Sequence, residues 1–146
     1  MVDEAAVARL HRALVEVAGP SAARRIAWRA GLLTGDYLLA NRIPRFAQVV
    51  LALLPRAWRA RILTRAIARH AWTFTGSGHF LPKIHEGLDL EIRDAPLLGQ
   101  ATSSDAASAY YAATLGRIFR TLVNREAAVA EIAGANSASR LFRVTW

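Results

Sequence analysis

Apolar positions in the first half of the chain recur at spacings of three and four residues, which is the period of an amphipathic helix. Prolines and one glycine divide this half, because proline favours the first turn of a helix and glycine favours its end. With Asp3 as the first N-cap, the pattern predicts helices at residues 3–18, 20–39, 44–54 and 55–70. The apolar faces expected for the first two helices are Val7, Leu10, Leu14 and Val17, and then Ile26, Leu33 and Tyr37.

The pattern changes after residue 70. Residues 88–92 alternate between apolar and acidic side chains, as a half-exposed strand does, whereas residues 106–123 present a wide apolar face typical of a helix. Strands are expected at 72–81, 88–92, 127–133 and 140–146, with connections at 82–87 and 134–137. Together these elements predict an α+β fold. N-terminal helices would pack on a small antiparallel sheet, with one helix inserted between its two hairpins.

Residues 70–80 combine aromatic side chains, glycines and histidines. If the segment is a strand, one of its faces carries Trp72, Phe74, Gly76, Gly78 and Phe80, because side chains alternate along a strand. Glycine in a strand often marks the close approach of a ligand or another backbone, so this face is a candidate wall for a flat ligand. The alternative is that the aromatics are plain core and the glycines form a bulge or a turn.

The fourth predicted helix separates charge from apolar surface. Arg61, Arg65 and Arg69 recur every four residues and form a basic ridge. His70 falls on roughly the opposite side of that helix and is expected to be buried. A lone histidine in such a place is more often a hydrogen-bonded core residue than a ligand, and both interpretations remain open.

Composition narrows the class of protein. A chain of 146 residues with 53% apolar residues is expected to form one domain, residues 1–146. No cysteine is present, which excludes disulfides and thiolate metal sites. No apolar run is long enough to cross a bilayer and the acidic start does not look like a signal peptide, so a cytoplasmic location is expected.

The charge is distributed unevenly along the chain. Residues 1–70 hold twelve arginines and four acidic residues, so they carry the whole formal net charge of +8. Such a field attracts anions: a nucleic acid, an anionic membrane surface or the carboxylates of a small ligand. Nucleic acid is the least favoured partner, because the arginines are spread over several helices and no nucleic-acid module is recognisable. Many of these arginines are also explained as solvated helix faces.

Three stretches of the sequence resemble a known family. They are Gly35-Asp-Tyr-Leu-Leu-Ala-Asn-Arg-Ile-Pro44, Leu53-Leu-Pro55 and Ala66-Ile-Ala-Arg-His-Ala-Trp-Thr-Phe-Thr-Gly-Ser-Gly78, followed in order by Tyr110–Thr114 and Phe119–Val123. Together they are similar to the 4-vinyl reductase family of bacteriochlorophyll biosynthesis (BchJ). The resemblance implies a small-molecule-binding domain similar in fold to the Bet3-type trafficking subunits and the haem domains that sense nitric oxide. Members of the wider family often carry cysteines in the second half, and any thiolate site of theirs cannot be carried over.

The resemblance implies a tetrapyrrole ligand of the Mg-porphyrin or protochlorophyllide type, with no intrinsic cofactor. Its flat apolar ring would stack on the aromatic face and on Tyr110 or Tyr111. His79 or His70 is the candidate axial ligand to a bound metal, although magnesium prefers oxygen. Arginine matches the planar carboxylates of such a ligand, and the candidates are Arg42, Arg45 and Arg69.

Two other functions remain open. The first is a vinyl reductase, or a subunit of one, but Thr75-Gly-Ser-Gly78 is a poor nucleotide site because no helix or parallel sheet is expected after it. The second is a structural module whose basic half docks on other bacteriochlorophyll-pathway enzymes or, peripherally, on the photosynthetic membrane. A homodimer is compatible with each of these functions.

Overall fold

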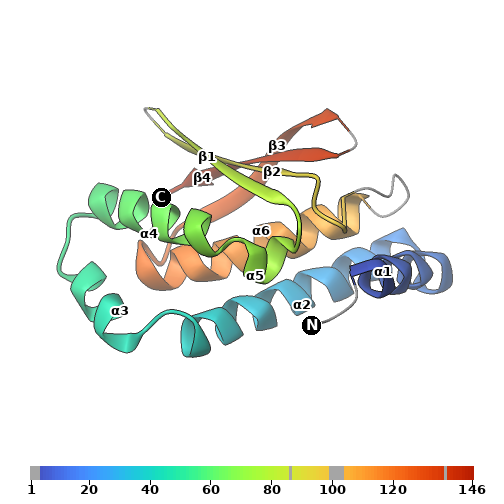
Figure 1. Ribbon diagram of the computed structural model, residues 1–146, viewed down its shortest axis with the longest axis horizontal. Helices are drawn as coiled ribbons and strands as arrows, with labels where there is room; N and C mark the ends of the chain where they lie inside the picture. The colour runs from blue at the N-terminus through green and yellow to red at the C-terminus, as the bar shows by residue number, and fades with distance from the viewer. Residues whose placement is uncertain (1–3, 86, 99–103, 137) are drawn as a thin grey trace.

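The computed structural model describes residues 4–85, 87–98, 104–136 and 138–146, in which helices pack against one face of a four-stranded sheet (Figure 1). The helices are α1 (Glu4–Ala18), α2 (Pro20–Asn41), α3 (Arg45–Ala52), α4 (Arg56–His70), α5 (Trp72–Thr75) and α6 (Ser104–Leu122). The strands are β1 (His79–Ile84), β2 (Leu88–Arg93), β3 (Ala128–Asn136) and β4 (Ser139–Thr145).

The sheet is antiparallel throughout, in the order β1-β2-β4-β3. Its two hairpins, β1–β2 and β3–β4, meet along β2 and β4, where Leu90 is directly opposite Phe142. Helix α6 lies between these hairpins in the sequence and packs beneath the sheet (Figure 1). This arrangement confirms the predicted α+β fold with one inserted helix.

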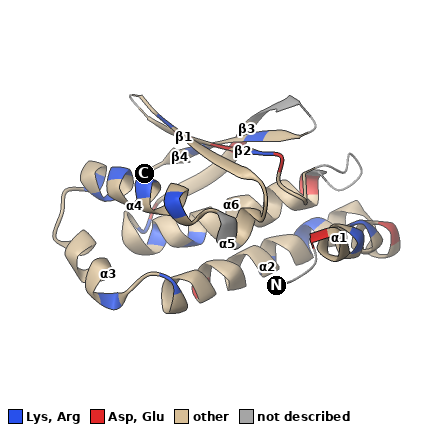
Figure 2. Ribbon diagram, in the orientation of Figure 1, with Lys and Arg blue, Asp and Glu red and all other residues tan. Residues whose placement is uncertain are grey.

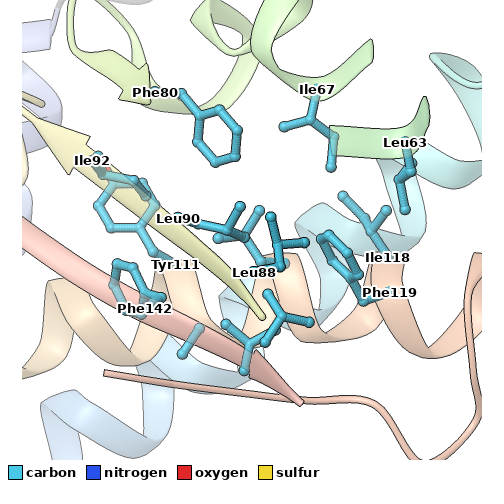
Figure 3. Close-up of a cluster of buried hydrophobic side chains, with 14 of the residues drawn as sticks. Leu63, Ile67, Phe80, Leu88, Leu90, Ile92, Tyr111, Ile118, Phe119 and Phe142 are labelled. Carbon is cyan, nitrogen blue, oxygen red and sulfur yellow. The ribbon is translucent and has the colours of Figure 1, made fainter. Parts of the chain in front are cut away.

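The main core lies between the sheet and α6. Leu90 and Ile92 on β2 and Phe142 on β4 are completely buried, and they belong to one cluster with buried side chains of α6 that include Tyr111 and Phe119 (Figure 3). Helix α2 packs on the opposite side of α6 (Figure 1). Because α6 is covered on two sides, it needs the wide apolar face that its sequence predicts.

The contact between α2 and α6 is made by small residues, and the predicted apolar face of α2 is wrong. The buried residues that recur every four positions along α2 are Ala23, Ala27, Gly31 and Gly35. The larger residues expected there are exposed instead: Ile26, Leu33 and Tyr37. Small side chains let two helix backbones approach closely, so the side of α2 with the least bulk faces α6.

The stripe predicted on α1 is also mostly exposed. Val7, Leu10 and Val17 are exposed, whereas Leu14 packs against a small cluster formed by Ala23, Ala27 and Ala106. The predicted cap, Asp3, lies outside the described residues. Helix α1 is therefore attached along part of one face only.

The strand predicted over residues 72–81 is wrong, because helical backbone continues beyond α4. Ala71 has helical angles (φ −58°, ψ −31°), and the Thr75 hydroxyl donates a hydrogen bond to its carbonyl oxygen at 2.8 Å. Gly76, with φ +62° and ψ −130°, then turns the chain away from the helical path. Strand β1 begins at His79 and continues through Pro82 to Ile84, so the predicted connection at 82–87 is shorter than expected.

The remaining boundaries differ by a few residues. Helix α3 ends at Ala52, two residues earlier than predicted, and α2 ends two residues later, at Asn41. Strand β3 extends to Asn136 and includes most of the predicted 134–137 turn, whose last residue lies outside the described part of the chain. Strand β2 agrees with its prediction.

The polar face of β2 is buried, although its alternation predicts an exposed face. The carboxylate of Asp89 accepts hydrogen bonds from the Arg143 guanidinium at 2.9 and 3.0 Å, and that of Glu91 accepts bonds from Arg93 at 2.6 and 3.0 Å. Lys83 adds an ion pair of 2.9 Å to Glu91. The bonds from Arg143 and Arg93 lower the pKa values of Asp89 and Glu91 to about 2, although burial acts in the opposite direction.

Candidate functional site

The main cavity of the described structure lies among the helices rather than on the sheet. It has a volume of about 580 Å³ and is walled by the C-terminal end of α2, by α3 and by α4, with one side chain each from α5 and α6. We call it the helical pocket. Its apolar lining includes Leu38, Ile43, Phe46, Val50, Leu54, Ile62, Leu63, Ile67, Phe74 and Ile118. Both the volume and the apolar character are typical of sites for small organic ligands.

Three polar residues line the helical pocket. Asn41 and Arg42 come from the end of α2, and His70 is the last residue of α4. The Asn41 side-chain amide donates a hydrogen bond of 2.9 Å to the Tyr37 carbonyl oxygen. Arg42 and His70 have exposed side chains, so the expectation that His70 is buried is wrong. Among the described lining residues none is acidic, so the pocket combines apolar walls with a cationic rim.

Hydrogen bonds from two side chains hold α3 in place as a wall of the pocket. The Gln48 amide donates to the carbonyl oxygens of Leu39 and Ile43, at 2.8 and 2.9 Å. The Arg59 guanidinium donates to the carbonyl oxygen of Leu54, at 2.6 Å, and to that of Ala52 at the end of α3. Of the residues of α3, Leu51 alone is buried, so these polar contacts largely fix the position of the helix.

The structure brings three of the predicted ligand-binding residues together. Arg42, His70 and Phe74 all line the helical pocket. Phe80 lies behind Phe74, with the two rings edge to face and their centroids 6.1 Å apart, but it is buried in the core. Of the described side chains of segment 70–80, those of His70 and Phe74 line the pocket.

The two glycines of this segment face other parts of the protein. A Cβ atom at Gly76 would lie 2.5 Å from a carboxylate oxygen of Glu4, and one at Gly78 would lie 2.6 Å from the Cα of Ala95. Glu4 also accepts hydrogen bonds from the backbone N–H and the hydroxyl of Ser77, each 2.8 Å long. The expected gap for a ligand is thus filled by α1 and by the loop after β2. The Gly-Ser-Gly turn joins a helix to a strand, so it does not have the geometry of a phosphate-binding loop.

The other predicted site residues lie away from the pocket. Arg45, Arg69 and His79 are exposed and do not line it. The Tyr110 hydroxyl donates a hydrogen bond of 3.2 Å to Thr34 on α2. Tyr111 is buried in the core, where burial raises the pKa of its phenol. The side chain of Trp72 lies outside the part of the structure that is described.

Most of the pocket was not predicted from the sequence. Ile43, Phe46, Val50 and Leu54 line it from α3 and its two flanking connections. The signal in the sequence was a short helix with apolar residues on nearly every side. This is more apolar surface than an eight-residue helix needs to pack on one neighbour.

Two negative findings bear on function. In the part of the chain that the structure describes, no group of three or more histidine, cysteine or acidic residues has a metal-binding arrangement. Likewise, the described helices include none with the length and apolar character to cross a membrane.

Two curated proteins resemble the chain over nearly its whole length. A protein named bacteriochlorophyll synthase 23 kDa chain, from Rhodobacter capsulatus, is 42% identical over 136 residues, which is 93% of this chain. A protein of the same name from Cereibacter sphaeroides is 42% identical over 133 residues, or 91% of this chain. Each relative is therefore similar to this chain along nearly all of the chain's own length.

This similarity confirms the resemblance drawn from the sequence motifs. The chain spans slightly less than two thirds of each relative, 63% and 64% of their lengths. No family model matches the chain. The relatives are named as chains of a synthase, and vinyl reduction stays a prediction.

Proposed function

We propose that this chain serves bacteriochlorophyll synthesis by holding a tetrapyrrole intermediate, of the Mg-porphyrin or protochlorophyllide type, in the helical pocket. The observation that carries this proposal is an apolar pocket of about 580 Å³ whose charged and titratable lining residues are one arginine and one histidine. The pathway in this proposal is taken from the names of the two relatives, and the class of ligand is inferred from the chemistry of the pocket.

The pocket matches the chemistry of such a ligand in three respects. A tetrapyrrole ring is flat and apolar, and aliphatic side chains with Phe46 and Phe74 offer surfaces for it. Its carboxylates need a cation near water, and the exposed guanidinium of Arg42 meets that need at the rim. His70, at the end of α4, offers a nitrogen to a central metal, either directly or through a water, since magnesium tends to keep oxygen ligands.

Titration with Mg-protoporphyrin tests the proposal directly. We expect a shift of the Soret band with a dissociation constant in the micromolar range or below. Ala47→Phe would place a ring in the pocket and should weaken binding at least tenfold, because Ala47 lines it. Ala52→Phe is the matched control, since Ala52 is on the same helix, is exposed and does not line the pocket. The absence of a Soret shift, or equal binding by Ala47→Phe and wild type, would rule the proposal out.

A second pair of variants tests the polar rim. Arg42→Gln should weaken binding by up to about tenfold, a moderate loss because the guanidinium is exposed to solvent. Arg69→Gln should leave affinity unchanged, since Arg69 does not line the pocket.

The histidine is tested in the same titration. His70→Ala should alter the position of the Soret band of the bound metalloporphyrin, and His79→Ala should not, because His79 lies outside the pocket. If His79→Ala gives the larger effect, the ligand is bound elsewhere.

A further inference from the structure

Helix α3 presents an apolar face to solvent that no described part of the chain covers. The exposed fractions are 73% for Phe46, 62% for Val49, 55% for Val50 and 81% for Leu53, which directly follows the helix. At 100° per residue these four side chains share one side of α3. Figure 1 shows α3 at one end of the molecule, away from the sheet. We call these four residues the α3 face.

The segments of the chain on both sides of this face carry positive charge only. Between residues 37 and 85 the chain has seven arginines and one lysine and no acidic residue. Helix α3 begins at Arg45 and α4 begins at Arg56, so a guanidinium flanks the apolar segment at each end. In Figure 2 the ribbons of α3 and α4 carry blue and no red.

We propose that the α3 face docks on the surface of an anionic lipid bilayer. A short helix with apolar residues on one side and arginine at its edges inserts its apolar side at the headgroup boundary, where anionic lipids attract the cations. Trp58, in the first turn of α4 and 61% exposed, belongs to the residue type that prefers this boundary. The charge favours lipid over a second copy of the chain, because symmetric pairing of this face would bring like charges together.

Docking there would place the helical pocket at the membrane. Phe46 and Val50 belong both to the α3 face and to the pocket lining. An apolar ligand could then pass between bilayer and pocket without crossing water. This consequence rests on the proposed tetrapyrrole ligand, whereas docking itself does not.

Vesicle co-sedimentation tests the docking. Vesicles of phosphatidylcholine with phosphatidylglycerol should bind the protein at low salt and release it as salt rises, and pure phosphatidylcholine should bind it far more weakly. The double variant Val49→Glu with Leu53→Glu should lower the partition coefficient at least tenfold. Val17→Glu, at an 88% exposed apolar position on α1, is the matched control and should bind like wild type.

Three results would overturn the docking proposal. They are no binding to anionic vesicles at low salt, equal binding by wild type and the double variant, or loss of a dimer in the double variant by light scattering. Neither Val49 nor Leu53 lines the pocket, so the double variant should still give the Soret shift with Mg-protoporphyrin. Failure of docking is therefore distinguishable from failure of ligand binding. Circular dichroism and urea unfolding establish that the variants are folded.

Discussion

Replacing Gly31 by alanine should destabilise the fold, although alanine is the better helix former. Gly31 lies where α2 and α6 approach most closely, and a Cβ atom there would be 2.3 Å from the Tyr110 carbonyl oxygen and 2.9 Å from the Cβ of Ala113. The neighbouring Thr114 hydroxyl also lies 3.1 Å from the Gly31 carbonyl oxygen, so the two helices are joined by a hydrogen bond at this point. The contact would be with a backbone atom of α6, which cannot move unless the whole packed helix moves.

Two opposing effects set the magnitude. Overpacking of this kind costs about 1–3 kcal/mol, and contact with backbone puts Gly31→Ala at the upper end of that range. In the other direction, the higher helix propensity of alanine stabilises the folded state by about 1 kcal/mol relative to glycine. The net loss in unfolding free energy is then about 2 kcal/mol, or a fall in Tm of roughly 4–8 °C for a chain of this size.

Gly116 on α6 provides a matched control. A Cβ atom at Gly116 would meet the Arg120 guanidinium at 3.4 Å, which is the flexible end of a side chain. Gly116→Ala should therefore raise the unfolding free energy by about 0.5–1 kcal/mol through propensity alone. Urea unfolding followed by circular dichroism measures both changes. If both variants shift in the same direction, close packing of α2 on α6 is refuted.

Two further predictions concern the sheet and the turn before it. In the folded state Asp89 and Glu91 have pKa values of about 2, against ordinary values of 3.8 and 4.5. Their ionised carboxylates therefore stabilise the fold above about pH 4.5, and this stabilisation is lost as the pH falls toward 2. The urea midpoint should fall over that window, and less steeply in Asp89→Asn; a midpoint independent of pH there would contradict the ion-pair assignment. Gly76→Ala should cost about 1–3 kcal/mol, because its backbone conformation suits glycine and its space is occupied by Glu4. A double-mutant cycle by thermal unfolding should find a smaller cost in the Glu4→Ala background, and equal costs would show that backbone strain alone is responsible.

The elements that sequence reasoning predicted correctly have local signals. Pro20 lies at the start of α2, and Pro44 and Pro55 directly precede α3 and α4, as their fixed φ favours. The strict alternation of residues 88–92 identified β2, since a one-residue slip would have exposed three large aliphatic side chains.

The faces of α2 and α1 were mispredicted because large apolar residues were assumed to point inward. Close packing against α6 needs small residues instead, and Ala23, Ala27, Gly31 and Gly35 supply them at steps of four. That spacing was visible in the sequence, but its meaning depends on the presence of a second helix at close range. The strand predicted over 72–81 is wrong for a similar reason. The aromatic residues alternate as in a strand, but the helix continues through Thr75 and the chain turns at Gly76.

The candidate site was only partly predictable because its walls come from elements that are distant in sequence. Arg42 and His70 were selected for their chemistry, and both line the pocket because the ends of α2 and α4 contribute to its walls. Arg45 and His79 have the same chemistry and lie elsewhere. Residue type therefore identifies the candidate ligand-binding residues, and only the tertiary structure shows which of them line the pocket.

Helix α6 connects the two parts of the molecule. Phe119 is completely buried in the core with the sheet, whereas the neighbouring Ile118 reaches the lining of the helical pocket. The core shared with the sheet fixes one side of α6, and the small residues of α2 fix the other. The sheet therefore supports the pocket without lining it. The surplus charge of the first half, the apolar pocket and the α3 face all lie on the helices. The proposed ligand site and the proposed docking surface therefore belong to the same part of the fold, which packs on the sheet through α6.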